Sequence, residues 1–231
     1  MRNLFRLKIQ SKSTLRGNIK ANTFFGVFCQ AYKMVHDEDE LRIFLECLAD
    51  NSEEMTFSNM LKPGTLELLD TPKSTPRPHC MVSRVMNGNN DLYITEDKIV
   101  RQFDVMLYTS LSKKGVQKLA DIVELLGIGA NRSVGTGNIK ILGIEEETLP
   151  EHTNQMTILS DIVPDEETPV HGQFEFMTRH GVTMGGNKQS SIIQIKAGSI
   201  FANNKVDKVT YGRVLYDEPS DTFINCKGIA V

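Results

Sequence analysis

Residues 127–140, GIGANRSVGTGNIK, narrow the fold and the function of this chain more than any other stretch of its sequence. Four glycines fall within eleven residues of this stretch: Gly127, Gly129, Gly135 and Gly137. Glycine permits positive φ angles and lets backbone amides approach a bulky polar ligand. The same stretch supplies donors of the kind that phosphate accepts, namely Asn131, Arg132 and Ser133. The composition indicates either a phosphate-binding loop or a flexible surface loop, and by itself favours neither.

The patterns on either side of this loop argue against a nucleotide cofactor. A helical pattern precedes the loop and a strand pattern follows it, which reverses the strand–loop–helix order of a P-loop, and no G-K-[S/T] is present. The dinucleotide motif G-x-G-x-x-G also fails, because Arg132 stands where its third glycine belongs. We therefore expect no cofactor, and we expect an extended polyphosphate such as RNA if the loop binds phosphate.

The charges of the chain are segregated along the sequence. A length of 231 residues allows one large domain or two small ones, and a net charge of −3 gives no general signal for polyanion binding. Residues 1–36 nevertheless carry seven basic side chains and no acidic one, whereas residues 37–54 carry eight acidic side chains and residues 145–167 carry another eight. This distribution fits a protein with one basic face and acidic outer surfaces, although amphipathic helices also produce it.

Cysteine usage and hydropathy point to the cytoplasm. The four cysteines form no C-x-x-C pair, and the chain has neither a signal peptide nor an apolar run near 18 residues. We expect a cytoplasmic protein with free thiols and no membrane contact. His79 and Cys80 lack two further ligands at the spacing of a zinc site, so we expect no metal.

The first 145 residues alternate between strand and helix patterns. Strand patterns cover residues 3–10, 103–108 and 138–144, and helical patterns cover residues 24–35, 39–49 and 113–126. The first helix is expected to begin after Asn22 or Thr23, and the third to run from a Ser112 cap to Gly127. Residues 61–78 read as a long loop, and an Asn-Gly turn predicts a β-hairpin over about residues 79–98, with arms at residues 81–85 and 92–95. This order matches a ferredoxin-like βαββαβ domain over residues 1–145 with the hairpin inserted.

Residues 146–231 form a second, smaller domain in this interpretation. The domain is rich in β-branched residues, and glycines divide it into short strands at residues 155–163, 173–178, 191–196, 206–215 and 222–229. The predicted fold class is therefore α+β, with a β-rich second domain whose topology is that of a reduced ferredoxin-like unit.

Histidines give weak support to catalysis. A metal-independent ribonuclease needs a base near a 2′-hydroxyl and a cation for the developing charge. His79 with a neighbouring arginine contains both groups, and His180 follows a basic residue. A single histidine does not specify a general base, and no G-x-S-x-G motif is present. We therefore expect a protein that is not an enzyme, in which His79 and Arg84 contact RNA.

Four stretches together resemble the RAMP proteins of CRISPR effector complexes. Residues 23–32, TFFGVFCQAY, resemble the entry of their first helix, and residues 127–137 resemble their glycine-rich loop. Within that superfamily, residues 79–84, HCMVSR, are similar to a segment of subunit four of the type III-A Csm complex that leads into a hairpin thumb. Residues 197–201, AGSIF, are similar to a late strand entry of the same subunit family.

The resemblance implies a RAMP fold with a β-hairpin thumb and a non-catalytic role. Such a subunit caps the 5′ repeat-derived tag of the CRISPR RNA, with its thumb wedged between guide and target RNA. It also bridges the large polymerase-like subunit and a backbone RAMP subunit. Together with the residue chemistry, it predicts these RNA-binding residues: Arg16, Lys20, His79, Arg84, Gly127, Gly129, Asn131, Arg132, Ser133, Gly135, Gly137, Arg179, Lys188 and Ser199.

Two other functions remain open at the level of sequence. The first is a RAMP-type endoribonuclease that processes precursor CRISPR RNA with His79 or His180 as its base. The second is a scaffold subunit in which the glycine-rich loop contacts protein rather than RNA.

Overall fold

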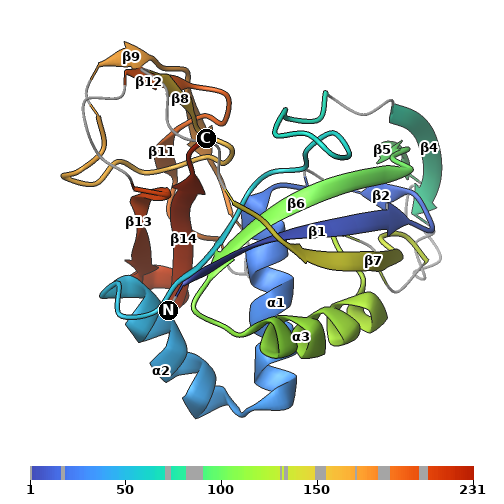
Figure 1. Cartoon of the computed structure of the whole chain (residues 1–231). Helices are drawn as coiled ribbons and strands as arrows, with labels where there is room; N and C mark the ends of the chain where they lie inside the picture. Colours follow the sequence, from blue (N-terminus) through green and yellow to red (C-terminus); the bar gives the residue numbers. More distant parts are fainter. Residues whose placement is uncertain are drawn as a thin grey trace.

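The computed structural model describes residues 2–16, 19–70, 74–81, 91–130, 132, 135–148, 155–169, 171–181, 188–202 and 208–231, with the backbone alone over residues 77–81 and 91–96. An antiparallel four-stranded sheet forms the centre of the N-terminal part, in the order β3-β6-β1-β7 (Figure 1). Its strands are β1 (Asn3–Ser11), β3 (Met55–Phe57), β6 (Gln102–Thr109) and β7 (Ile139–Glu146). With α1 (Ala21–Val35) after β1 and α3 (Lys113–Leu126) after β6, these elements follow the order βαββαβ, in which β3 is a strand that the sequence patterns did not predict.

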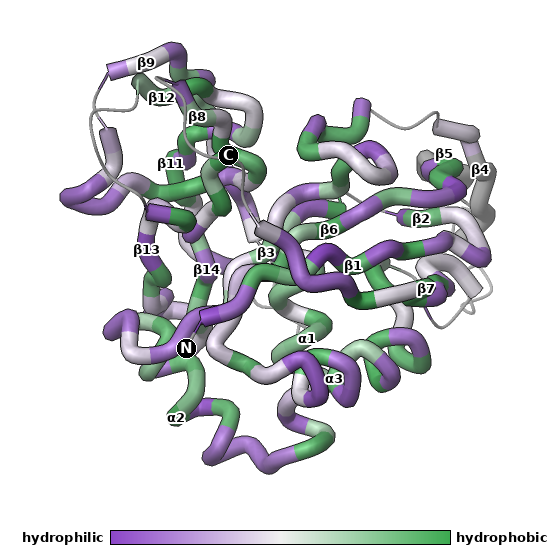
Figure 2. Tube along the Cα trace, viewed as in Figure 1, coloured by the Kyte–Doolittle hydropathy of each residue, from purple (hydrophilic) through white to green (hydrophobic). Residues whose placement is uncertain are grey.

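One face of this sheet is covered by helices. Phe5, Leu7 and Ile9 of β1 stand opposite Leu107, Val105 and Phe103 of β6, and all six residues belong to the main core. Helices α1 and α3 lie side by side on this face, where they bury one apolar stripe each (Figure 1). Figure 2 shows α2 (Glu38–Ala49) and α3 carrying both hydrophobic and hydrophilic residues, as amphipathic helices do.

The helix ends follow their sequence signals closely. The Ser112 side chain accepts a hydrogen bond of 3.2 Å from the Gly115 amide, and the helix ends at Gly127, whose φ is 69°. Helix α1 starts at Ala21 rather than after Asn22 or Thr23, because its first amide donates to the Asn59 side chain at 2.9 Å and Thr23 bonds the Lys20 amide. Tertiary contacts therefore move this start slightly towards the N-terminus.

The predicted loop over residues 61–78 is more ordered than its composition suggests. Its first part packs on the sheet face that lacks helices, where the buried Arg6 bonds the Thr65 carbonyl at 2.7 Å, Asp104 at 3.2 Å and Glu147 at 2.9 Å. The hydrogen bond between Arg6 and Glu147 raises the pKa of Arg6 and lowers the pKa of Glu147. Arg6 thus fixes the loop to β1 and β6.

The end of that stretch is a strand rather than a loop. Strand β4 (Ser74–Met81) pairs with β5 (Asp91–Lys98), and β5 pairs in turn with the short β2 (Leu15–Arg16). Pro76 and Pro78 cannot donate to a strand ladder, and β4 tolerates them because it lies at the edge of this three-stranded sheet. The hairpin arms therefore reach further from the turn than the predicted 81–85 and 92–95, while residues 82–90 lie outside the described part of the chain.

Short strands make up most of the C-terminal part. One sheet has the order β8-β12-β9, from β8 (Gln155–Thr157), β12 (Ile200–Ala202) and β9 (Gly172–Gln173). The β10 strand (Phe176–Arg179) pairs with β11 (Ile192–Ile195). The strands predicted at 155–163 and 206–215 are shorter than expected or displaced, since β8 ends at Thr157 and β13 starts at Thr210.

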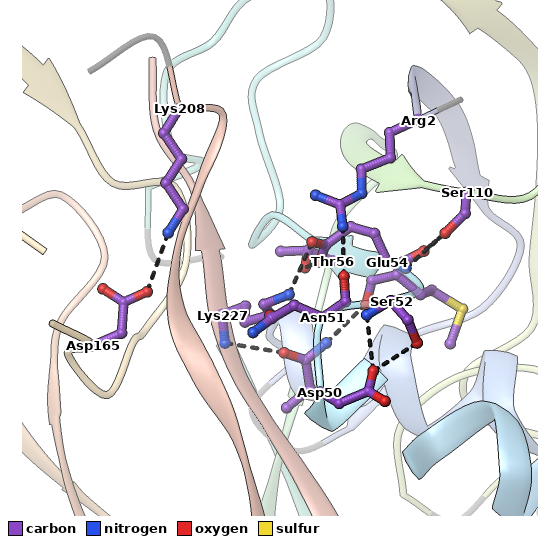
Figure 3. A network of polar contacts seen from close by, with 12 residues as sticks. Arg2, Asp50, Asn51, Ser52, Glu54, Thr56, Ser110, Asp165, Lys208 and Lys227 are labelled. Atoms are coloured by element: carbon purple, nitrogen blue, oxygen red, sulfur yellow. Dashed lines mark hydrogen bonds and ion pairs between the residues drawn. The ribbon is translucent and has the colours of Figure 1, made fainter. Parts of the chain in front are cut away.

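A long hairpin joins the C-terminal part to the first sheet. Its strands are β13 (Thr210–Asp217) and β14 (Thr222–Ile229), and β14 contacts β3 and α1. Val214 of β13 belongs to the main core. The Asn225 amide donates to the Met55 carbonyl at 2.8 Å, and the Lys227 ammonium lies 2.8 Å from Glu54 (Figure 3). The two regions of the sequence therefore share a packed interface.

The Glu54–Lys227 pair is withdrawn from solvent. The side chains are 2% and 5% exposed, and the Thr56 hydroxyl also donates to Glu54 at 2.6 Å (Figure 3). Beside it, Arg2 donates to the Asn51 carbonyl at 2.6 Å, and Lys208 forms an ion pair with Asp165 at 3.3 Å.

Among the helices that the structure describes, none has the length and the apolar content needed to span a bilayer.

Candidate nucleic-acid interface

All four glycines of the glycine-rich loop have positive φ angles, between 69° and 89°. A Cβ at Gly137 would overlap the Ile128 carbonyl oxygen, and one at Gly129 would lie 2.6 Å from the Arg16 carbonyl oxygen. At Gly135, by contrast, a Cβ would meet no atom of the described residues within 4 Å. The chain thus requires glycine at 129 and 137 for close approach to its own backbone, and Gly135 faces open space.

The amides of this loop are largely engaged within the protein. The Gly137 amide donates to the Thr14 carbonyl at 2.8 Å, and the Ala130 amide donates to the Arg16 carbonyl at 3.1 Å. The Ile128 amide donates to the Gly137 carbonyl at 2.8 Å. The loop is therefore a folded unit attached to residues 12–16 just ahead of α1.

Arg132 points into this unit. Its guanidinium lies 3.4 Å from the Gln30 side chain and the Leu126 carbonyl, and 3.3 Å from the Gly127 carbonyl. A cation at these carbonyls favourably faces the negative end of the α3 dipole. Sequence reasoning assigned Arg132 to phosphate, and the structure places it at a helix end instead. The adjacent Asn131 and Ser133 lie outside the described residues.

A cavity of about 470 Å³ lies between the start of α1 and strand β10, and we call it the Arg179 cavity. It brings together two predicted site residues, Lys20 and Arg179, from opposite ends of the sequence. The Lys20 ammonium lies 2.5 Å from Asp161, and Arg179 donates to the Gln189 side chain at 3.1 Å. The other lining residues are Asn22, Thr23, Met177, Thr178, His180, Gly181 and Gln194.

The electrostatics of this cavity are dominated by Arg179. Burial lowers the pKa of its guanidinium from the ordinary value of 12.5, but an arginine stays protonated in proteins at neutral pH. Lys20 and Asp161 largely neutralise each other, and the second oxygen of Asp161 accepts the Ala197 amide at 2.9 Å. The cavity can therefore attract an anion.

A second cavity, of about 240 Å³, adjoins the first, and we call it the Lys98 cavity. The two share Lys20 and Asp161, and the second adds Lys98 and Lys196. Its lining also includes Ile19, which packs against Gly129 of the glycine-rich loop. A basic cleft, made of these two cavities, thus runs from the glycine-rich loop to β10, with four basic side chains along it.

The remaining predicted residues lie around this cleft or outside the described part. Arg16 lies in β2 beside Gly129, and His79 lies in β4 opposite Tyr93 in the backbone register. Lys188 is exposed next to Gln189, the partner of Arg179. Ser199 is buried and accepts a hydrogen bond from the Glu175 amide at 3.1 Å, which gives it a structural role. Arg84, the predicted wedge residue, is not among the described residues.

Sequence reasoning missed four residues of the basic cleft: Lys98, Asp161, Gln194 and Lys196. Lys98 and Lys196 follow strand patterns with no distinguishing motif, and Asp161 lies in an acidic run that resembles a solvated surface. Gln194 stands at an ordinary strand position. Only the packing of β10 and β11 against the start of α1 identifies them.

Comparison with known proteins relates this architecture to solved complexes. No protein-family model matches the chain, and no curated protein matches its sequence. A chain of the Csm3–Csm4 subcomplex in the type III-A CRISPR-Cas interference complex matches with a TM-score of 0.60 at 13% identity, over 99% of this chain and 98% of that chain. A chain of the Csm1–Csm4 cassette in complex with cA4 matches with a TM-score of 0.58 at 13% identity, over 100% and 97%. The cassette in complex with AMPPNP gives a TM-score of 0.56 at 12% identity, with the same coverage.

Csm4 is the component that these assemblies have in common. Identities of 12–13% relate the chains by fold, and the coverage extends this relation to both ends of each chain. The chain therefore shares its fold, over its whole length, with a chain of these type III-A CRISPR complexes.

Proposed function

We propose that this chain is a non-catalytic, RNA-binding subunit of a type III-A CRISPR ribonucleoprotein in the cytoplasm. In this role its ferredoxin-like N-terminal domain and its C-terminal part hold the 5′ repeat-derived tag of the CRISPR RNA. The subunit bridges the large polymerase-like subunit and a backbone RAMP subunit. The observation that carries the proposal is the full-length similarity of fold to chains from assemblies whose common component is Csm4.

The basic cleft supports the RNA-binding part of this proposal. Single-stranded RNA is bound by positively charged grooves that follow its backbone, with soft or flat side chains against its bases. The cleft contains Lys20, Lys98, Arg179 and Lys196, of which Lys20 and Lys196 form ion pairs with Asp161 and Glu175, and Met177 lies at its end. Concentration of cations in one cleft also explains how an RNA-binding chain can carry a net charge of −3.

Assembly provides the test of the proposal as a whole. The tagged chain is co-expressed with the large subunit, the backbone subunit and CRISPR RNA, and the purified assembly is examined for protein and for RNA. We expect both subunits and an RNA with an intact 5′ tag to co-purify with the wild-type chain. A chain that retains neither subunit would contradict the proposal.

A charge reversal in the basic cleft distinguishes an RNA-binding subunit from a scaffold that does not bind RNA. The variant Lys98→Glu/Lys196→Glu is expected to keep both partner subunits and to lose protection of the RNA 5′ end. Unchanged protection of the tag in this variant would favour a scaffold that does not bind RNA.

Salt dependence measures how many phosphates the cleft contacts. For single strands, the slope of log K against log salt concentration is about −0.7 per neutralised phosphate. We expect Lys98→Gln to reduce this slope by about 0.7 in anisotropy titrations of the full-length chain with single-stranded RNA. Lys118→Gln, on the exposed face of α3 and outside both cavities, is the matched control. Equal slopes for the two variants would exclude Lys98 from phosphate contact.

RNA cleavage is the second candidate function, and one contact favours keeping it under test. The His180 ring lies 2.8 Å from the Ser191 hydroxyl, and His180 lines the same cavity as Lys20 and Arg179. A base and two cations are the groups that a metal-independent ribonuclease uses. We expect repeat RNA to remain intact with the wild-type chain in the presence of EDTA. Cleavage by the wild-type chain that His180→Ala abolishes would establish the endoribonuclease instead.

A further inference from the structure

Two polar atoms of the Arg179 cavity lack hydrogen-bond partners among the described residues. They are Nη1 of Arg179 and Oε1 of Gln194, and both are shielded by their surroundings. The whole Gln194 residue is only 1% exposed. Buried polar atoms are almost always paired, because leaving one without a partner is energetically unfavourable. A donor and an acceptor without partners among the described residues of one cavity therefore indicate a ligand that supplies the complementary groups.

The second terminal atom of each of these two side chains has a hydrogen-bond partner within the protein. Arg179 Nη2 donates to the Gln189 side chain, which in turn donates to the Thr222 hydroxyl at 2.9 Å. Gln194 Nε2 donates to the sulfur of Cys226 at 3.2 Å. With these nitrogens engaged, one guanidinium nitrogen and one carbonyl oxygen of residues that line the cavity have no partner among the described residues.

The charge of the cavity selects the kind of anion. Lys20 is paired with Asp161, so the lining carries one net positive charge, on Arg179, whose guanidinium is also attracted by Asp161 and Asp217. One positive charge matches a phosphodiester, which carries one negative charge, better than a terminal phosphate monoester with nearly two. The site thus fits an internal linkage of a nucleic acid strand.

The acceptor without a partner, Gln194 Oε1, favours ribose over deoxyribose. Gln194 Oε1 needs a hydrogen-bond donor, and the ribose 2′-hydroxyl is a donor that RNA carries next to every internal phosphodiester and that DNA lacks. The volume of about 470 Å³ falls within the range of sites for single small ligands, which suits one nucleotide unit. The thioether of Met177, which lies 3.2 Å from the Lys20 ammonium, can pack against its base.

We propose that the Arg179 cavity is a subsite for one ribonucleotide of a single strand. Arg179 binds its phosphodiester, and Gln194 accepts a hydrogen bond from its 2′-hydroxyl, so this subsite makes the chain select RNA over DNA. This inference rests on the proposed function, because it assumes that the basic cleft binds a nucleic acid strand.

A deoxy walk tests the sugar contact without altering the protein. The full-length chain is titrated by fluorescence anisotropy with an eight-nucleotide RNA and with versions in which a single position at a time is 2′-deoxy. We expect one position at which the deoxy sugar weakens binding about tenfold, because the buried acceptor then loses its donor. In Gln194→Met, the same walk is expected to be flat. Gln173→Met, an exposed position on β9, should retain the wild-type profile.

Arg179 is tested in the same assay. Arg179→Met is expected to weaken binding of the all-RNA strand by about tenfold or more, since hydrogen bonds to charged groups are stronger than those between neutral groups. Arg213→Met, on the exposed side of β13, is expected to bind like wild type. Thermal unfolding of each variant verifies that the fold is retained.

The outcomes separate this inference from the function on which it rests. RNA binding with a flat walk for the wild-type chain would overturn the ribonucleotide subsite and leave the proposed function standing. If Gln194→Met still showed the sensitive position in the deoxy walk, another residue would make the sugar contact. That result would overturn the assignment to Gln194. No binding of RNA by the wild-type chain or by its purified complex would remove the proposed function itself.

Discussion

Replacing Lys227 by methionine is expected to lower the free energy of unfolding by about 3–5 kcal/mol. Lys227 and Glu54 are buried together where β14 meets the N-terminal part of the chain, and their charged atoms lie 2.8 Å apart (Figure 3). Removing the ammonium leaves the Glu54 carboxylate buried, with the Thr56 hydroxyl as its remaining hydrogen-bond partner among the described residues, which is among the most costly single changes in a protein interior.

Denaturant unfolding followed by circular dichroism measures this effect. The control is Lys8→Met, which removes the exposed Lys8–Glu145 pair and should change stability by less than about 1 kcal/mol. The double variant Glu54→Gln/Lys227→Met no longer contains a buried unpaired charge and should recover part of the loss. Equal stabilities for Lys227→Met and Lys8→Met would show that the contact between β14 and β3 does not depend on this pair.

Substitution of Gly137 by alanine is expected to destabilise the fold by about 3 kcal/mol or more. The φ angle of Gly137 is 77°, and a Cβ there would overlap the Ile128 carbonyl oxygen. That carbonyl is part of the loop backbone and cannot rotate away as a flexible side chain would. The change would also weaken the hydrogen bond from the Gly137 amide to Thr14.

The loop itself provides a matched control in Gly135. Its φ of 89° is similarly unfavourable for alanine, but within the described part of the chain no atom lies within 4 Å of a Cβ at this position. Gly135→Ala should therefore cost only the backbone strain, about 1 kcal/mol. A thermal melt compares the two variants. If both glycines tolerated alanine equally, close packing of the loop on residues 12–16 would be wrong as the reason for its glycine content.

Much of the N-terminal fold could be predicted because its elements are long and periodic. The stripes of α1 and α3, the Ser112 cap and the alternation in β1 and β6 lie within three residues of their predicted limits. The second strand of the βαββαβ unit was missed because β3 has only three residues, all buried, and no alternation is visible over that length. Strand β4 was not predicted because it contains Pro76 and Pro78, and proline cannot donate to a strand ladder and is tolerated mainly at a sheet edge.

The candidate site was predictable in part. Lys20 and Arg179 were selected for their charge, and the fold brings them to one cavity. The inward direction of Arg132 depends on Gln30 and on the end of α3, which no local pattern reveals. Gln194 becomes notable only because its carbonyl oxygen is buried without a partner among the described residues. Such information exists in the packing rather than in residue type.

Crosslinking of the 5′ tag tests the central claim most directly. CRISPR RNA with a photoreactive base at each tag position is assembled with the chain and its partner subunits, and the crosslinked peptides are identified by mass spectrometry. We expect tag positions to crosslink to peptides containing Lys20, Lys98 and residues 177–181, which line the basic cleft. Crosslinks confined to other subunits, with this chain present in the assembly, would contradict this expectation.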